Sequence, residues 1–178
     1  MWKSVLESAG GNVFIESEQG RGSTFTLSVP LTLATMECIR FRVGAYRFSM
    51  PARYVYQFLE YGENKKNTQE NQGCSYILFE NRMVPMIDLR KFYRLEGETP
   101  DSAVLVYVRG TEKEGCILAE RVSEQKRLVV KQLPALFGVD FRRKTGVSGM
   151  SIMGNGKVCT ALDLEMLFGL YEKGSLWN

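Results

Sequence analysis

Residues 75–89 read SYILFENRMVPMIDL, and this stretch carries the clearest strand and turn signals of the chain. Its apolar runs at 75–79 and 83–87 flank Asn81-Arg82, a pattern that predicts a β-hairpin. Asp88 follows at the step into a short helix, where a carboxylate can accept hydrogen bonds from the first N–H groups. We therefore interpret Asp88 as a helix cap rather than as a general acid or a metal ligand.

Both faces of this hairpin are apolar. Because opposed residues of a hairpin share a face, one side groups Ile77, Phe79, Val84 and Met86. The other side groups Tyr76, Leu78, Met83, Pro85 and Ile87. A small barrel buries only one such face against its own interior. The second face must then meet a neighbouring barrel, a flanking helix or another protein.

The same pattern recurs along the chain. Further hairpins are predicted at 38–50, 103–119 and 148–162. Residues 155–164 loosely repeat 81–89, and Asp163 again precedes a short helix that it is expected to cap. Two such halves predict a mainly β protein built from two small β-barrels. Residues 61–73 are polar and rich in turn formers, so we expect an exposed, mobile loop there.

The composition is that of an ordinary globular protein and excludes several chemistries. Of 178 residues, 44% are hydrophobic and 24% are charged, and the net charge is only +3. The basic residues are scattered, which argues against a nucleic-acid binder. No apolar run reaches the roughly 20 residues that a membrane span needs. The first residues do not read as a signal peptide, so we expect a cytoplasmic protein with no direct membrane insertion.

Histidine is absent and the four cysteines are widely spaced. The lack of histidine excludes a Ser-His-Asp triad, a Cys-His pair and a phosphohistidine on this chain. Zinc would require the scattered cysteine thiolates or carboxylates. We interpret the cysteines as reduced and mostly buried thiols, and we expect no catalytic residue, no metal and no cofactor.

Residues 1–30 look incomplete by themselves. A helix over 3–9 and strands at 12–17 and 24–29 are predicted, and the hairpin should bury one apolar side through Phe25, Leu27 and Val29. The turn around Gly20-Arg21-Gly22-Ser23-Thr24 could suggest a phosphate-binding loop. Such a loop needs a lysine before the hydroxyl residue and a helix after it, and both are missing. A hairpin turn is the better interpretation.

Several motifs occur together in one order along the chain. They are residues 10–18, 20–25, 29–34, 41–51, 84–90 and 146–158, followed by Asp163. The first three resemble the end of the ATP-binding domain and the linker of CheA chemotaxis histidine kinases. The others resemble the CheW-like regulatory domain of the same kinases. The resemblance covers nearly the whole chain.

The resemblance implies a fold and a division of the chain. Residues 1–34 would be a helix and hairpin remnant of an α/β ATPase domain with its linker. Residues 35–178 would be a CheW-like regulatory domain made of two five-stranded Src-homology-3-like barrels. Their approximate ranges are 36–97 and 98–172, with strands that could be exchanged between them. Met1 would then begin an expressed fragment or a truncated reading frame.

The resemblance also implies a role. The domain would bind the adapter CheW and the cytoplasmic tips of chemoreceptors, at membrane receptor arrays, and pass receptor state to the rest of a dimeric kinase through residues 31–34. Ser23 stands where the ATPase superfamily has a nucleotide-site threonine, but the rest of that site is missing from this sequence. We expect Tyr76, Leu78 and Met83 to face a CheW-type partner. A free-standing CheW-type adapter and a residual nucleotide-binding or kinase fragment are the alternatives.

Overall fold

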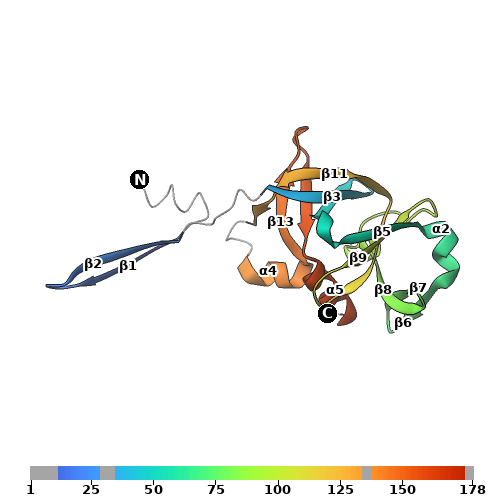
Figure 1. Ribbon diagram of the computed structural model, residues 1–178, viewed down its shortest axis with the longest axis horizontal. Helices are drawn as coiled ribbons and strands as arrows, with labels where there is room; N and C mark the ends of the chain where they lie inside the picture. The colour runs from blue at the N-terminus through green and yellow to red at the C-terminus, as the bar shows by residue number, and fades with distance from the viewer. Residues whose placement is uncertain (1–11, 29–34, 134–137, 175–178) are drawn as a thin grey trace.

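A separate β-hairpin and a body of two sheets make up the described part of the chain (Figure 1). The computed structural model describes residues 12–28, 35–133 and 138–174. The helix predicted over 3–9, the linker 31–34 and the side chains of Leu27 and Val29 lie outside the described residues.

The hairpin predicted near the N-terminus is confirmed. Strands β1 (Asn12–Glu18) and β2 (Gly22–Ser28) pair antiparallel, with Asn12 opposite Ser28 and Glu18 opposite Gly22. The turn uses Gly20 at a φ of 82°, a left-handed conformation that glycine adopts without a steric penalty. Figure 1 shows the hairpin pointing away from the two sheets.

Sheet I has six strands in the order β11-β3-β4-β14-β13-β12. In chain order they are β3 (Thr35–Val43), β4 (Tyr46–Pro51), β11 (Arg121–Val129), β12 (Lys131–Gln132), β13 (Val147–Ile152) and β14 (Val158–Leu162). Strands β14 and β4 run parallel, with Thr160 opposite Phe48, and the other neighbours are antiparallel.

Sheet II also has six strands, in the order β5-β9-β10-β8-β7-β6. They are β5 (Val55–Glu60), β6 (Thr68–Asn71), β7 (Cys74–Phe79), β8 (Arg82–Asp88), β9 (Val104–Arg109) and β10 (Glu114–Ala119). Strand β10 pairs parallel with β8 and antiparallel with β9. Each sheet therefore contains strands from both halves of the sequence, joined through a single parallel pair.

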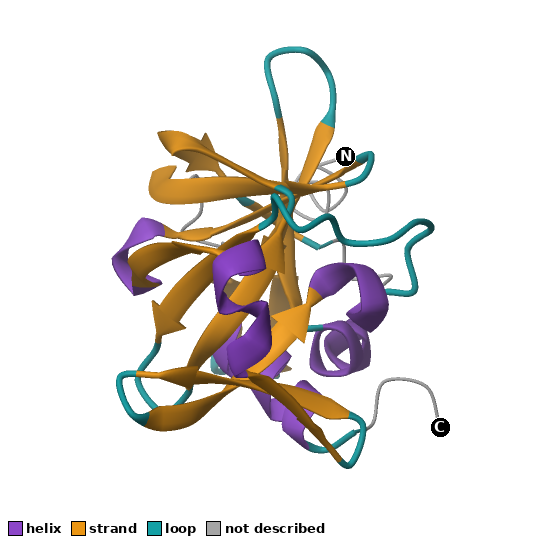
Figure 2. Cartoon of the chain, turned by 90° about the vertical axis from the view of Figure 1, so that its right-hand side faces the viewer, coloured by secondary structure: helices purple, strands orange, loops and turns teal. Residues whose placement is uncertain are grey.

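Short helices connect the strands, and Figure 2 shows them beside the sheets. They are η1 (Ala52–Tyr54), α2 (Tyr61–Asn64), η2 (Lys65–Asn67), α3 (Leu89–Phe92), α4 (Gly138–Thr145) and α5 (Leu164–Glu172). Both predicted caps are confirmed. Asp88 Oδ1 accepts a hydrogen bond from the N–H of Arg90 at 2.9 Å, and Asp163 Oδ1 accepts one from Met166 at 3.1 Å.

Two apolar cores hold the sheets. The larger core lies between sheets I and II and includes residues of α3 and α5. The smaller core lies on the other side of sheet II. Strand β9 serves both cores, because Val106 and Val108 belong to the larger one and Leu105 and Tyr107 to the smaller one. Burial of both faces explains why β9 is an almost continuous apolar run.

The end of α5 packs closely against sheet II at Gly115. A Cβ atom at this position would overlap both the Phe168 ring and the carbonyl oxygen of Pro85. Only glycine leaves room for that ring, which is fully buried in the larger core. This close approach fixes α5 between the two sheets.

Two expectations about the fold are wrong. The strands form two six-stranded sheets that are not closed into five-stranded barrels, because the parallel pairs β10–β8 and β14–β4 link strands from distant parts of the sequence. Residues 61–73 are not one irregular loop, since they contain α2, η2 and β6. Strand β6 is an edge strand with a mostly exposed, polar sequence, so it has no apolar periodicity that would reveal it.

Candidate protein-binding surface

The hairpin of β7 and β8 presents the candidate surface. Tyr76 lies opposite Pro85, and Leu78 lies opposite Met83. The turn between the strands places Glu80 at a φ of 46° and Asn81 at 62°. Positive φ at two successive positions is the geometry of a tight hairpin turn, and asparagine tolerates it well. The two-residue turn thereby sets the register that brings Leu78 and Met83 together.

The two faces of this hairpin differ in burial. Ile77, Phe79, Val84 and Met86 share one face, as the alternation predicts, and this face is buried in the smaller core. On the other face Leu78 is 47% exposed and Met83 is 42% exposed. Tyr76 is on the same face but half-buried. Of the three residues predicted for a partner, two are therefore adjacent and exposed, and the third borders them.

Burial of the second face increases along β8. Met83 is exposed, Pro85 is half-buried, and Ile87 is fully buried in the core between the sheets. The two ends of this apolar face therefore have different surroundings. Its far end packs against the neighbouring sheet, and its end near the turn faces solvent.

A network of charged side chains lies near the β7–β8 turn of sheet II. The sequence pattern did not predict any charged cluster there. Arg82 donates to Glu114 Oε1 at 2.7 Å, and the Tyr107 hydroxyl donates to Glu114 Oε2 at 2.7 Å. Arg109 Nε lies 3.3 Å from the same Oε2. The hydrogen bond from Tyr107, helped by the charges of Arg82 and Arg109, lowers the pKa of Glu114. Residues 82 and 114 meet only through the strand order, so no local signal could reveal this network.

Aromatic rings extend the network toward the edge strand β5. The Arg109 guanidinium lies 4.7 Å from the ring centroid of Tyr56, an exposed residue of β5. The Tyr107 ring stacks on Phe79 with centroids 4.0 Å apart. These contacts hold the charged groups near the hairpin turn, on the face that carries Phe79 and Tyr107.

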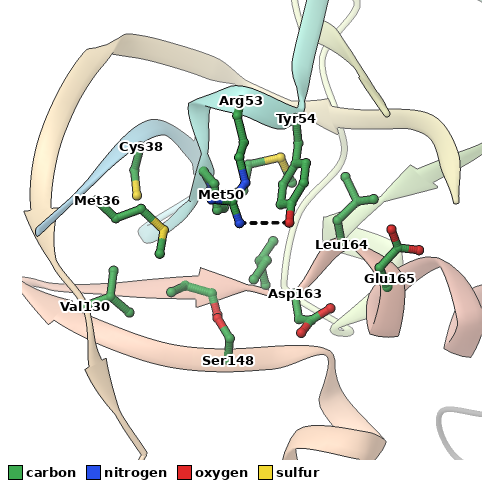
Figure 3. Close-up of a pocket in the computed structure, with 13 residues that line it drawn as sticks. Met36, Cys38, Met50, Arg53, Tyr54, Val130, Ser148, Asp163, Leu164 and Glu165 are labelled. Carbon is green, nitrogen blue, oxygen red and sulfur yellow. Dashed lines mark hydrogen bonds between the residues drawn. The ribbon is translucent and has the colours of Figure 1, made fainter. Parts of the chain in front are cut away.

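A separate cavity of about 240 Å³ opens in sheet I and is shown in Figure 3. Mostly apolar side chains line it, among them Met36, Met50 and Val130. Its polar groups serve the fold. Arg53 donates to the Tyr54 hydroxyl at 3.0 Å, a contact drawn in Figure 3, and the Asp163 carboxylate caps α5.

Two further polar side chains of the cavity form hydrogen bonds, although the buried Oε2 of Glu165 has no hydrogen-bond partner among the described residues. Glu165 Oε1 accepts the N–H groups of Thr111 at 2.6 Å and Glu112 at 3.1 Å. The Ser148 hydroxyl donates to the carbonyl of Ala161 at 3.2 Å. Within the described ranges no base lies in hydrogen-bond contact with that serine, so the cavity offers no activated nucleophile.

The cysteines fit the expectation of buried thiols. All four are free and buried. Burial raises the pKa of Cys116 to about 12 and also raises the pKa of Cys74. A thiol with a raised pKa is a poor nucleophile and metal ligand near neutral pH. In the part of the chain that the structure describes, no group of three or more Cys, Asp or Glu side chains could hold a metal ion.

Ser23 has a local role in the structure. Its hydroxyl lies 2.8 Å from the Ser17 hydroxyl, its cross-strand partner in the β1–β2 hairpin. Both residues are exposed. The contact helps to hold the two strands of the hairpin together.

The fold defines a mainly β domain with two sheets that share strands from both halves of the sequence. The profile of the CheW-like domain family matches residues 37–172. The chain therefore belongs to the CheW-like domain family, whose members act in chemotaxis signalling. None of the helices among the described residues is long and apolar enough to cross a membrane.

Relatives and solved structures agree with this assignment. The chain is 26% identical over 170 residues to the chemotaxis protein CheA of Salmonella typhimurium, covering 94% of this chain and 25% of that protein. It is 28% identical over 179 residues to CheA of Cereibacter sphaeroides, covering 99% of this chain and 25% of that protein. It thus spans about a quarter of the length of these relatives.

A solved structure shares the fold. The scaffolding protein TtCheW of Thermoanaerobacter tengcongensis matches with a TM-score of 0.60 and 15% sequence identity. The match covers 81% of this chain and 99% of TtCheW. The sheets described above are therefore the CheW fold.

Proposed function

We propose that this chain is the regulatory and scaffolding part of a chemotaxis histidine kinase. In this role it binds a CheW-type adapter and the cytoplasmic tips of chemoreceptors, and couples receptor state to the kinase. Residues 1–34 belong to the end of the ATP-binding domain and its linker, and residues 35–178 to the regulatory domain. The protein works in the cytoplasm at membrane receptor arrays.

The exposed pair Leu78 and Met83 carries the proposal of an adapter surface. Two large apolar side chains lie directly opposite each other on a hairpin whose other face is fully occupied by the core. An apolar centre beside charged residues is the usual composition of a protein interface. The Arg82–Glu114 pair, at 2.7 Å, lies close to the hairpin turn, with Arg82 on the face that carries Phe79.

Titration with a purified CheW-type adapter tests this surface. The variants Leu78→Glu and Met83→Glu should each weaken adapter binding by about 1–3 kcal/mol, the scale of a buried interface anchor. Val129→Glu is the matched control, because Val129 is an exposed apolar residue of sheet I. Binding that is unchanged in both test variants, or weakened equally in the control, would refute the surface.

Membership in a longer kinase is supported by the extent of the similarity. The CheA relatives match 94% and 99% of this chain, and so extend beyond the family domain at 37–172. A free-standing CheW-type adapter is the second candidate, because the chain superposes on nearly all of TtCheW. The reading frame upstream of Met1 separates the two, since only a kinase carries an ATPase domain there.

We propose further that this chain alone neither binds ATP nor transfers phosphate. It has no histidine to accept a phosphoryl group. Ser23, the one residue that matches a nucleotide-site motif, lies exposed on a hairpin. Isothermal titration with ATP should show no saturable heat, and nucleotide should not raise the melting temperature. Binding in the millimolar range or tighter would instead support a residual nucleotide-binding fragment.

A further inference from the structure

The cavity in sheet I lies where two parallel strands end. Strands β4 and β14 run in the same direction, with Thr160 opposite Phe48, so their carboxyl ends reach the same edge of the sheet. Strand β4 continues into η1, and β14 continues into α5. The strand order therefore brings Arg53 of η1 and Leu162 at the end of β14 to one opening, although they are far apart in the sequence.

The walls of the cavity are apolar and adaptable. Met50 and Leu162 are buried, Met36 is half-buried, and the small side chains of Cys38 and Ala161 leave space between them. Methionine is flexible and polarisable, so it adapts to apolar groups of different shape. Drug-sized ligands take pockets of roughly 300–1,000 Å³. A cavity of about 240 Å³ therefore fits a smaller molecule.

The start of α5 compensates the two carboxylates of the cavity. Asp163 accepts the N–H of Met166 at 3.1 Å, and Glu165 Oε1 accepts the N–H of Thr111 at 2.6 Å. Both carboxylates lie at the N-terminal end of α5, where the helix dipole stabilises negative charge. Glu165 Oε2 has no partner within the described ranges, but it is buried and so beyond the reach of a ligand. The fold therefore holds these negative charges without a cationic ligand.

Arg53 is the cationic side chain of the lining, and its charge is not compensated in this way. Its guanidinium group extends from η1 into the cavity and donates to the Tyr54 hydroxyl at 3.0 Å (Figure 3). Over residues 12–28, 35–133 and 138–174 no carboxylate forms an ion pair with it. Arg53 is exposed, so a ligand can reach it.

The charge of Arg53 is also felt at the apolar wall. Burial and the neighbouring Cys159 raise the pKa of the Cys38 thiol, and the Arg53 charge opposes that rise. Cys38 is 1% exposed and lines the cavity. A positive charge with only a neutral partner therefore lies beside a buried apolar space. A molecule with an anionic group and an apolar body matches both features.

We propose that this cavity binds a small carboxylate with an apolar body, of the class of short-chain aliphatic acids. The carboxylate accepts hydrogen bonds from the Arg53 guanidinium, which favours bidentate contacts, and from the Tyr54 hydroxyl. The aliphatic chain packs against Met36, Met50 and Val130. The site lies in sheet I and is independent of the adapter surface on sheet II, so the two proposals are tested separately.

Isothermal titration of the full chain with three compounds of equal chain length tests the ligand class. Hexanoate should give saturable heat. Hexylamine and hexanol should bind roughly tenfold or more weakly, because neither forms a charge-assisted pair with Arg53. Butanoate should also bind roughly tenfold more weakly than hexanoate, because it buries two fewer methylene groups.

Variants of the lining separate the two parts of the site. Arg53→Gln should weaken hexanoate binding roughly tenfold or more and leave hexanol binding unchanged. Arg143→Gln removes the same charge from an exposed position of α4 and should change hexanoate affinity less than about twofold. Val130→Trp places a larger side chain on the apolar wall and should abolish binding of both compounds. Circular dichroism checks that each variant is folded.

Each opposite result overturns a defined part of the proposal. No saturable heat with hexanoate overturns the site itself. Equal affinities for hexanoate, hexylamine and hexanol overturn the carboxylate assignment, and equal losses in Arg53→Gln and Arg143→Gln overturn the role of Arg53. A short peptide ending in leucine also carries a carboxylate beside an apolar group. Stronger competition by that peptide than by free hexanoate overturns the choice of a small molecule.

Discussion

The hairpins β1–β2 and β7–β8 are built alike and surrounded differently. Each has two antiparallel strands, a tight turn with positive φ, and apolar cross-strand pairs. Ile15 and Phe25 form a cross-strand pair in the first hairpin, and each is 56% exposed. Ile77 and Val84 form the matching pair in the second, and both are buried.

The difference shows what a hairpin can and cannot supply. Local sequence suffices to pair two strands, but a two-stranded hairpin has no second layer to cover its apolar face. Hairpin β7–β8 has the remaining strands of sheet II around it, while β1–β2 forms a two-stranded sheet of its own. The strands that surround a hairpin, rather than its own sequence pattern, therefore determine whether its apolar residues join the core. The following predictions test this contrast, from the largest expected effect to the smallest.

Limited proteolysis should separate the two hairpins most clearly. Cleavage should begin before about Met36 and leave a stable product that contains both sheets. We expect cleavage in the N-terminal region to exceed cleavage in β7–β8 by roughly a hundredfold or more, because opening the latter disrupts a packed core. Mass spectrometry of the products measures this. Equal resistance of both hairpins in a dilute, monomeric sample would contradict the contrast.

Truncating the matching isoleucines compares the hairpins directly. Ile77→Ala should lower the free energy of unfolding by about 2–5 kcal/mol, because it leaves a cavity in the smaller core. Ile15→Ala should change it by less than about 0.5 kcal/mol, because the side chain is exposed. Urea denaturation measures both. Similar losses would show that β1–β2 packs on the sheets in solution.

Substitutions on the exposed face of β7–β8 should change the free energy of unfolding as little as substitutions in β1–β2. Leu78→Glu and Met83→Glu should shift the free energy of unfolding by less than about 0.5 kcal/mol, because neither side chain belongs to a core. Thermal melting checks this. If both variants unfold, and still bind the adapter whenever folded, the two faces of the hairpin are reversed.

The smallest expected effect is the pH dependence of the network around Glu114. The folded state holds the pKa of Glu114 below its ordinary value. Its contribution to stability is present above the unfolded-state pKa of glutamate, roughly 4.3, and is lost as pH falls through the lower folded-state value.

Acid denaturation of paired variants measures this effect. Glu114→Gln should lose less stability than the unmodified chain between neutral pH and strong acid, by less than about 1 kcal/mol. Glu18→Gln is the control, because Glu18 and Arg21 form an exposed pair in β1–β2. A control as sensitive as Glu114→Gln would show that the network adds nothing specific.

Much of the local structure could be predicted from the sequence. The alternation in 75–87 predicted which side chains share a face, and Ile77 and Met86 lie together on the buried one. Asp88 and Asp163 cap helices as their positions before Leu indicated. These features depend on residues a few positions apart, so a short stretch contains all the information that they need.

Other features could not be predicted because they depend on distant segments. The polar sequence of strand β6 predicts a loop, because this strand pairs with β7 without entering a core. The Arg82–Glu114 pair and the opposition of Arg42 and Arg121 both require the strand order and register. Residues 42 and 121 become neighbours only when β11 pairs with β3.

The hairpins, the helix caps and the grouping of side chains by face follow from local backbone preferences and side-chain period, so residues close in the chain specify them. The order of the strands, the open form of the sheets and the exposure of particular apolar faces depend on contacts between distant segments. Those outcomes follow from the burial of apolar area over the whole chain, where Ile77 finds a covering layer and Leu78, the next residue, does not.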